Sequence, residues 1–166
     1  MSPDCCLRLI STAPAATEAL GAWLARALPD GSVVALRGDL AAGKTCLVRG
    51  MAAALGAGAP VHSPTFTLVN EYVGARRLLH LDLYRLHDPE EFMALGHEEL
   101  LEPEGICVIE WAERAGGLLP PRRVDVMLDH AGGDRRSIEI GDRGVMQPGW
   151  QGTLPADDGL LSAAQA

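Results

Sequence analysis

Apolar positions along the chain follow two kinds of spacing, and the two kinds alternate. Short stretches in which apolar residues alternate with polar ones, or run together, predict β-strands. The predicted strands are 6–10, 32–36, 66–72, 77–85, 105–111, 123–129 and 136–140. Stretches with apolar residues three and four positions apart predict helices. The predicted helices are 17–28, 46–55 and 90–95, with a further helical piece that reaches residue 101.

Local signals mark where several of these elements begin. Ser11 or Thr12 is expected to cap the first helix, because a side-chain oxygen can accept from the unpaired N–H groups there. Asp88 followed by Pro89 has the residue types of another helix start. The stretch 105–111 begins with a continuous apolar run, which is typical of a central strand buried on both faces.

Strands that alternate with helices around one loop predict a three-layer α/β domain. Two pairs of neighbouring strands, within 66–85 and 123–140, are joined by short glycine-containing segments and predict hairpins. The sheet is therefore expected to be mixed and partly antiparallel. The length of 166 residues suggests one domain. We assign residues 1–145 to it and expect 146–166, which lack strong periodicity, to form a loosely ordered tail.

Charge and cysteine content narrow the expected partners and compartment. Fourteen basic against 22 acidic residues give a net charge of −8, a poor match for free nucleic acid, so a partner protein is expected to carry any RNA. The four cysteines lack C-x-x-C spacing, which argues against disulfides and zinc and fits a reduced cytosol. Cys46 and Cys107 are expected to be small core residues. Without a signal-peptide pattern or an apolar run of about 18 residues, we expect a soluble cytoplasmic protein that does not contact a membrane.

The most informative motif is G-x-x-x-x-G-K-T at residues 38–45, which follows an apolar run and precedes a predicted helix. Strand, glycine loop and helix form the context that a phosphate-binding loop requires. Gly38 and Gly43 permit backbone angles that turn successive N–H groups inward, beside a helix N-terminus that favours anions. Lys44 is the only lysine in the chain. It is expected to reach the β- and γ-phosphates, and Thr45 to bind Mg²⁺ through its hydroxyl.

Nucleotide hydrolysis also needs a carboxylate for the metal and a group that orients the attacking water. Glu110 stands near the end of the apolar run 105–111, where a metal-linked acid of this class is found; the alternative is a strand-end acid that faces solvent. Asp82 is the best candidate for the water-orienting acid. The alternative for Asp82 is an ion pair with Arg85 or another arginine.

Three further residues have open roles. Thr65 follows the rigid pair Ser63–Pro64, and it is either a sensor of the γ-phosphate or a plain strand start. His80 shares a strand face with Asp82, but such a histidine is more often a hydrogen-bonded structural residue than a base. Arg136, in the last predicted hairpin, either contacts the nucleotide or is solvated at the surface.

Four ordered motifs resemble those of one family. They are the loop 38–45, the segment SPTFTLV at 63–69, the segment HLDLYRL at 80–86 and the tripeptide IEW at 109–111. In this order they resemble the TsaE (YjeE-type) bacterial ATPases. The resemblance extends over about residues 16–140, nearly the whole predicted domain, and implies a P-loop NTPase-like fold.

The resemblance implies a Mg²⁺-dependent ATPase required for threonylcarbamoyl transfer to adenosine 37 of tRNAs that read ANN codons. In that family a TsaB–TsaD heterodimer holds the tRNA and performs the transfer, and ATP hydrolysis is thought to reset the pair between turnovers. Carried over to this sequence, Lys44 and the loop amides hold the phosphates, Thr45 and Glu110 hold Mg²⁺, and Asp82 supports hydrolysis. The segment entering the first helix would lie near the adenine.

Two loop residues depart from the family's pattern, which usually has Gly at the position of Ala41 and often Thr at that of Cys46. Ala41 adds a Cβ to the loop, and Cys46 lacks a hydroxyl near the α-phosphate.

The catalytic candidates are Lys44, Asp82 and Glu110. The residues expected to contact the nucleotide are Gly38, Asp39, Leu40, Ala41, Ala42, Gly43, Lys44, Thr45, Cys46, Thr65 and Arg136.

Two other classes of protein use the same loop. A small-molecule or nucleoside kinase needs an arginine-rich lid, and Arg76–Arg77 and Arg122–Arg123 are the only candidates for one. A GTP-dependent switch normally carries an N-K-x-D motif that reads guanine, and the chain has none. The kinase is the second hypothesis and the GTP switch the third.

Overall fold

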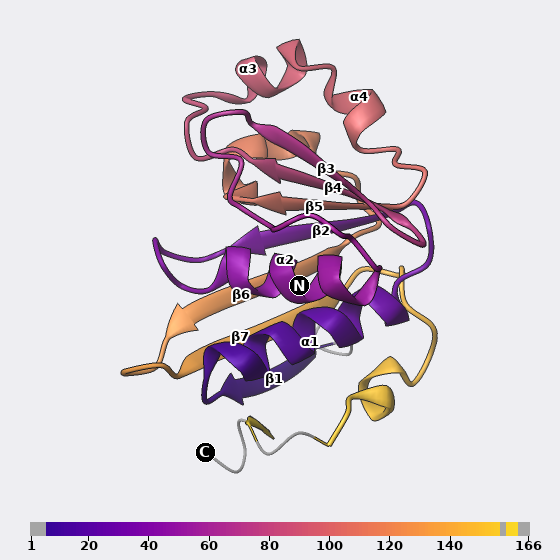
Figure 1. The fold of residues 1–166 in the computed structure, drawn as a ribbon. Coiled ribbons are helices and arrows are strands. Elements are labelled where there is room, and N and C mark those ends of the chain that lie inside the picture. Colours follow the sequence, from indigo (N-terminus) through magenta and orange to yellow (C-terminus); the bar gives the residue numbers. More distant parts are fainter. Residues whose placement is uncertain (1–5, 157–158, 163–166) are drawn as a thin grey trace.

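A single mixed β-sheet runs through the computed structural model, which describes residues 6–156 and 159–162 (Figure 1). Within these residues the sheet has eight strands in the order β3-β4-β5-β2-β6-β7-β1-β8. The strands are β1 (Cys6–Ser11), β2 (Ser32–Arg37), β3 (Val69–Val73), β4 (Arg77–Asp82), β5 (Ile106–Glu110), β6 (Val124–His130), β7 (Arg136–Asp142) and β8 (Leu160–Ser162). The central strands β4, β5, β2 and β6 are parallel, and the other pairings are antiparallel. The predicted mixed α/β fold is confirmed.

Helices cover both faces of this sheet. They are α1 (Pro14–Ala27), α2 (Lys44–Ala54), α3 (Pro89–Ala94), α4 (His97–Leu100) and the 3-10 helices η2 (Ala112–Leu118) and η3 (Trp150–Thr153). Helices α1 and α2 lie side by side on one face, and α3 and η2 pack on the other face near β4 and β5 (Figure 1). Asp88 caps α3 as predicted, accepting from the Glu91 N–H at 3.0 Å. In the described part of the chain, no helix is long and apolar enough to span a membrane.

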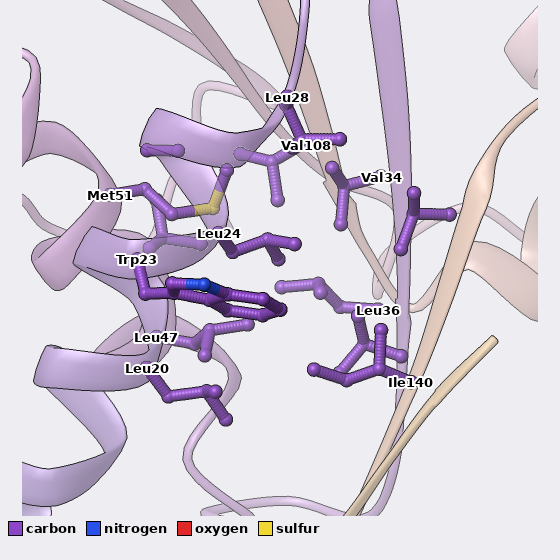
Figure 2. Close-up of a cluster of buried hydrophobic side chains, with 14 of the residues drawn as sticks. Leu20, Trp23, Leu24, Leu28, Val34, Leu36, Leu47, Met51, Val108 and Ile140 are labelled. Carbon is purple, nitrogen blue, oxygen red and sulfur yellow. The ribbon is translucent and has the colours of Figure 1, made fainter. Parts of the chain in front are cut away.

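Strand β2 belongs to both apolar cores. Val34 and Leu36 face the cluster beneath α1 and α2 that Figure 2 shows, whereas Val33 and Ala35 belong to the cluster on the opposite face. This division follows from the two-residue period of a strand. All four side chains are buried, so β2 is packed on both faces. The loop after Arg37 therefore begins at the end of a central strand, between β5 and β6.

Helices α1 and α2 cross at close range because glycine stands where their backbones meet. A Cβ built on Gly21 would lie 2.1 Å from the carbonyl oxygen of Leu47, and one built on Gly50 would lie 1.9 Å from that of Glu18. No side chain fits at such distances, and only glycine permits this approach. The crossing fixes the position of α2, and therefore of the loop that precedes it.

The first helix starts earlier than predicted and without the expected cap. It begins at Pro14, and its N-cap residue Ala13 makes no side-chain hydrogen bond to the helix. Ser11 is the last residue of β1, and its hydroxyl bonds to the Ala13 carbonyl (2.9 Å) and the Thr17 hydroxyl (2.7 Å). The prediction that Ser11 or Thr12 caps α1 is wrong, because the pairing of β1 extends through Ser11.

The strand predicted from residue 66 starts only at Val69. Leu68 has a φ of +66°, which interrupts an extended backbone, and its N–H donates to the Pro64 carbonyl at 2.6 Å to close a turn. Phe66 lies in this turn and is 80% exposed. The alternation of Phe66 and Leu68 therefore reflects a surface turn and not a strand.

The segment after residue 145 is packed where the structure describes it, in contrast to the loose tail that the sequence predicted. Trp150 in η3 is buried with its ring centre 5.9 Å from that of Trp23, and Trp23 Nε1 donates to the Thr153 hydroxyl at 3.1 Å. Strand β8 pairs with β1, which is consequently not an edge strand. Residues 157–158 and 163–166 lie outside the described part.

Asp125 holds three arginines on the face of β6 that points away from α1 and α2. Its carboxylate is buried and accepts from Arg37 Nη1 and Arg123 Nε, both at 2.8 Å, and from Arg143 Nε. Burial alone would raise the pKa of this carboxyl, but the three guanidinium groups outweigh burial and hold the pKa of Asp125 below its ordinary value. The cluster ties the end of β2 to β6 and to the residue after β7.

Acid should weaken the fold through Asp125. A carboxyl whose pKa is lower in the folded chain stabilises the fold above its unfolded pKa of about 3.9, and this stabilisation disappears as the pH falls through the folded pKa. We expect Asp125→Asn to lower the free energy of unfolding at pH 7 by about 1.5–3 kcal/mol, because hydrogen bonds to a charged carboxylate are lost. The variant should also lose part of the wild-type dependence on pH below about 5.

Urea denaturation at several pH values measures both effects. Asp129→Asn is the matched control, because Asp129 lies on the same strand but is exposed. An acid dependence in Asp125→Asn as steep as in the wild type would contradict the prediction.

Candidate functional site

The loop between β2 and α2 has the backbone conformation of a phosphate-binding loop. Gly38 and Gly43 have φ values of +133° and +104°, in a region that favours glycine. A Cβ on Gly38 would also lie 2.0 Å from the carbonyl oxygen of Leu128 on the neighbouring strand β6. The loop leads directly into α2, whose first N–H groups have no partner within the helix.

Lys44, the first residue of α2, turns its side chain back over the loop. Its Nζ donates to the carbonyl oxygens of Gly38 (2.6 Å) and Asp39 (2.7 Å) and lies 4.0 Å from the centre of the Trp111 ring. Burial lowers the pKa of Lys44, and the nearby acids, Glu110 first among them, partly offset this shift. The ammonium group is held by neutral carbonyls and a ring, a setting that suits an anionic ligand.

Glu110 is buried at the end of β5 and does not face solvent. Its Oε1 accepts from the Thr45 hydroxyl at 2.8 Å and lies 2.8 Å from His80 Nε2. The interaction with Thr45 joins the end of β5 to the first turn of α2. The structure thus places the two predicted metal ligands, Thr45 and Glu110, in direct contact.

Asp82 ends β4 directly opposite Glu110, in the register of two parallel strands. Its Oδ2 accepts from the hydroxyls of Ser63 (2.6 Å) and Thr65 (2.7 Å), and its Oδ1 accepts from the Tyr84 N–H (2.9 Å). In the described part of the chain no arginine pairs with it, so the alternative of an ion pair between Asp82 and Arg85 or another arginine is wrong. Thr65 is not a strand start either; it lies in the turn before β3.

These residues line one cleft of about 310 Å³. Its walls come from the loop and α2 on one side and from the ends of β4 and β5 on the other. The lining residues are Leu40, Ala41, Ala42, Gly43, Lys44, Thr45, Cys46, Ser63, Thr65, Asp82, Tyr84, Glu110 and Trp111. The three catalytic candidates, Lys44, Asp82 and Glu110, therefore all line the same cleft.

Gly38 and Asp39, which were predicted to contact the nucleotide, do not line the cleft, and two further predicted contacts have a different setting. Arg136 does not line the cleft: its Nε and Nη2 donate to the carbonyls of Ala42 (3.1 Å) and Ala41 (3.3 Å), so it supports the loop from behind. Cys46 lines the cleft and is only half-buried, unlike the core residue expected, whereas Cys107 is fully buried. The Cys46 thiol donates to the Pro14 carbonyl at 3.3 Å, and burial raises its pKa.

Two residues of the cleft, Ser63 and Tyr84, had no assigned role in the sequence, and Trp111 was expected only to pack at the rim of the site. Ser63 joins Thr65 on Asp82, and the rigid Ser63–Pro64 pair was the available signal. Trp111 adopts a left-handed φ of +57°, which is costly for a bulky residue, and its ring packs at a tilt against that of Tyr84 with centres 4.9 Å apart. This conformation brings the Trp111 ring against Lys44, and no local sequence pattern predicts it.

A glycine loop with a lysine joins a strand to a helix at the parallel centre of a mixed sheet, and acids end the two neighbouring strands β4 and β5. This arrangement defines a P-loop NTPase fold. The family model for the threonylcarbamoyl adenosine biosynthesis protein TsaE matches residues 11–138. The chain belongs to the TsaE family.

Individual relatives agree with this assignment. The TsaE protein of Treponema pallidum is 42% identical over 134 residues, which cover 81% of this chain and 99% of that protein. The TsaE protein of Haemophilus influenzae is 45% identical over 109 residues, covering 65% of this chain and 68% of that protein. The crystal structure of YdiB from Bacillus subtilis is similar with a TM-score of 0.70 and 32% identity, over 84% of this chain and 86% of that one.

Ala41 introduces strain into the loop. It has a φ of +61°, the left-handed conformation that costs an L-residue roughly 1–2 kcal/mol and glycine almost nothing. Glycine also loses more conformational entropy on folding, which offsets part of the gain. We expect Ala41→Gly to raise the free energy of unfolding by about 0.5–1 kcal/mol.

Ala19→Gly, in the interior of α1, is the matched control, and it should lower stability by about 1 kcal/mol. Urea denaturation of both variants measures the difference. A loss of stability in Ala41→Gly similar to that in Ala19→Gly would contradict the strain.

Proposed function

We propose that the chain is a Mg²⁺-dependent ATPase that acts as an accessory subunit in the formation of threonylcarbamoyladenosine in tRNA. The observation that carries the proposal is the contact of Thr45 with Glu110 in the same cleft as Lys44 and the glycine loop. Membership of the TsaE family supports the tRNA pathway. A role on tRNA also supports a cytoplasmic location.

The charge of the cleft supports the requirement for a metal. Lys44 is the only basic side chain among the described lining residues, and it faces the two acids Asp82 and Glu110. A bare triphosphate would meet two carboxylates, so a divalent cation has to accompany it. When bound, the cation neutralises the phosphates and polarises them for attack.

The donor set fits magnesium. Within residues 6–156 and 159–162, no group of three or more His, Cys, Asp or Glu side chains is placed to hold a metal alone. Mg²⁺ is usually held by one or two protein oxygens together with phosphates and water. Thr45 and Glu110 would hold it, because a hydroxyl that donates its proton keeps lone pairs for a metal.

Asp82 would orient the attacking water. Three donors fix its carboxylate at the cleft wall, and two of them are the hydroxyls of Ser63 and Thr65. Thr65 also lines the cleft and donates to this acid, so its hydroxyl would respond to a γ-phosphate. Lys44 and the loop amides would bind the phosphate chain.

The partner would be a TsaB–TsaD type heterodimer, which binds the tRNA and performs the transfer. The net charge of −8 supports indirect contact with RNA. No arginine lines the cleft among the described residues, so hydrolysis by the chain alone should be slow. The kinase hypothesis lacks its lid, because the guanidinium groups of Arg76–Arg77 and Arg122–Arg123 bind acids and carbonyls outside the cleft.

The accessory role is tested by measuring ATP hydrolysis with and without the TsaB–TsaD pair, and capture of that pair with and without ATP. Stimulated hydrolysis and nucleotide-dependent capture are expected. Equal rates for the isolated chain and the complex would contradict the role. Transfer of labelled phosphate to a metabolite would indicate the kinase, and stronger competition by GTP than by ATP the GTP switch.

Lys44→Ala should weaken nucleotide binding by about 100-fold or more, because two charge-assisted hydrogen bonds to phosphate are lost. Titration with a fluorescent ATP analogue measures the affinity. Unchanged urea denaturation would show that the variant is folded. Binding within about threefold of the wild type would place the phosphates elsewhere.

Asp82→Ala should leave nucleotide affinity within about threefold and slow hydrolysis by a factor on the order of 100, because a positioned acid typically contributes this much. Single-turnover hydrolysis at saturating ATP measures the step. Asp129→Ala, which changes an exposed acid outside the cleft, is the control. Unchanged turnover in Asp82→Ala would remove Asp82 from the mechanism.

A further inference from the structure

His80 is a fully buried histidine that contacts the metal-linked acid from the interior of the protein. It lies on β4, and its Nε2 is 2.8 Å from Glu110 Oε1. The same oxygen accepts from the Thr45 hydroxyl, also at 2.8 Å. Among the described residues, the other carboxylate oxygen, Oε2, accepts no hydrogen bond. One oxygen of Glu110 is thus held by two donors while the other is left for a ligand.

The two ring nitrogens of His80 have different surroundings, and the difference assigns the proton. Nε2 faces a carboxylate, which only accepts hydrogen bonds, so Nε2 has to carry the proton. Nδ1 is buried and has no partner. A proton on Nδ1 would be an unpaired buried donor, whereas a bare Nδ1 leaves only an unpaired acceptor. The geometry therefore places a proton on Nε2, on the side of Glu110.

We propose that His80 is a positioning residue: its Nε2–H fixes the Glu110 carboxylate so that Oε2 is available to the metal. The metal in this inference rests on the proposed function, whereas the contact between His80 and Glu110 is a feature of the structure. Groups that hydrogen-bond to metal ligands orient them, and their loss typically reduces metal affinity 10- to 100-fold. His80 does not line the cleft.

The same geometry excludes His80 as a general base. A base must present a bare nitrogen to the proton it removes, but the nitrogen on the Glu110 side already carries a proton, and the bare one is enclosed. Packing alone is the remaining alternative, since the ring also lies 6.2 Å from that of Tyr72. An experiment has to separate the hydrogen bond from the packing.

Three variants make this separation. His80→Leu removes the donor and keeps an apolar side chain in the core, whereas His80→Gln restores an N–H donor of similar reach. Leu78→Ala is the matched control. Leu78 is buried on the same face of β4, two positions before His80 and therefore further from Glu110. Each variant is compared with the wild type by Mn²⁺ binding in the presence of ATP, followed by electron paramagnetic resonance.

His80→Leu should raise the apparent dissociation constant for Mn²⁺ about 10-fold, and leave ATP binding without metal within about twofold. His80→Gln should recover the constant to within about threefold of the wild type, and Leu78→Ala should leave it within about twofold. An unchanged constant in His80→Leu, or an equal rise in Leu78→Ala, would overturn the positioning role. Failure of His80→Gln to recover it would do the same.

The tautomer is tested on the wild type without nucleotide or metal, so this arm does not depend on the proposed function. Nitrogen-15 spectra of the histidine ring should show the proton of His80 on Nε2, with a shift of that signal in Glu110→Gln. A proton on Nδ1, or no response to Glu110→Gln, would overturn the inference. Absence of ATP binding by the wild type would instead overturn the proposed function.

Discussion

A buried carboxylate has to be hydrogen-bonded, and this requirement joins the three elements that form the site. Glu110 on β5 receives donors from Thr45 at the start of α2 and from His80 on β4. An ionised carboxylate buried without such partners costs several kcal/mol. The pairing therefore holds the first turn of the loop helix against the strand ends. It also keeps an acid available beside Lys44.

The same principle operates on the other acid of the cleft and in the support of the loop. Asp82 binds the hydroxyls of Ser63 and Thr65, which tethers the turn before β3 to the end of β4. Behind the loop, Arg136 binds its carbonyl oxygens and does not enter the cleft. Arg136 is thus engaged outside the cleft, and Lys44 is left to face a ligand as the single positive charge of the described lining.

How much could be predicted from the sequence depended on how local each feature is. The loop 38–45 and the capping of α3 by Asp88 involve contiguous residues, so their patterns were sufficient. The turn at Leu68 and the start of α1 at Pro14 were missed. Neither the left-handed conformation of Leu68 nor the extension of β1 to Ser11 is marked by the residues next to it in the sequence. The packing of Trp150 on Trp23 joins residues far apart in the chain, so the order of the tail could not be predicted.

The sequence by itself determined the phosphate-binding loop, the mixed α/β class and the identity of both acids, since each depends on residue type, spacing or strand period. Only the tertiary structure decided which groups these acids contact. In the folded chain Glu110 contacts Thr45 and His80, and Asp82 accepts from two hydroxyls. Arg136 binds the loop carbonyls outside the cleft. These choices depend on which strands are neighbours in the sheet. Strand order follows from packing across the whole domain, which no local pattern encodes.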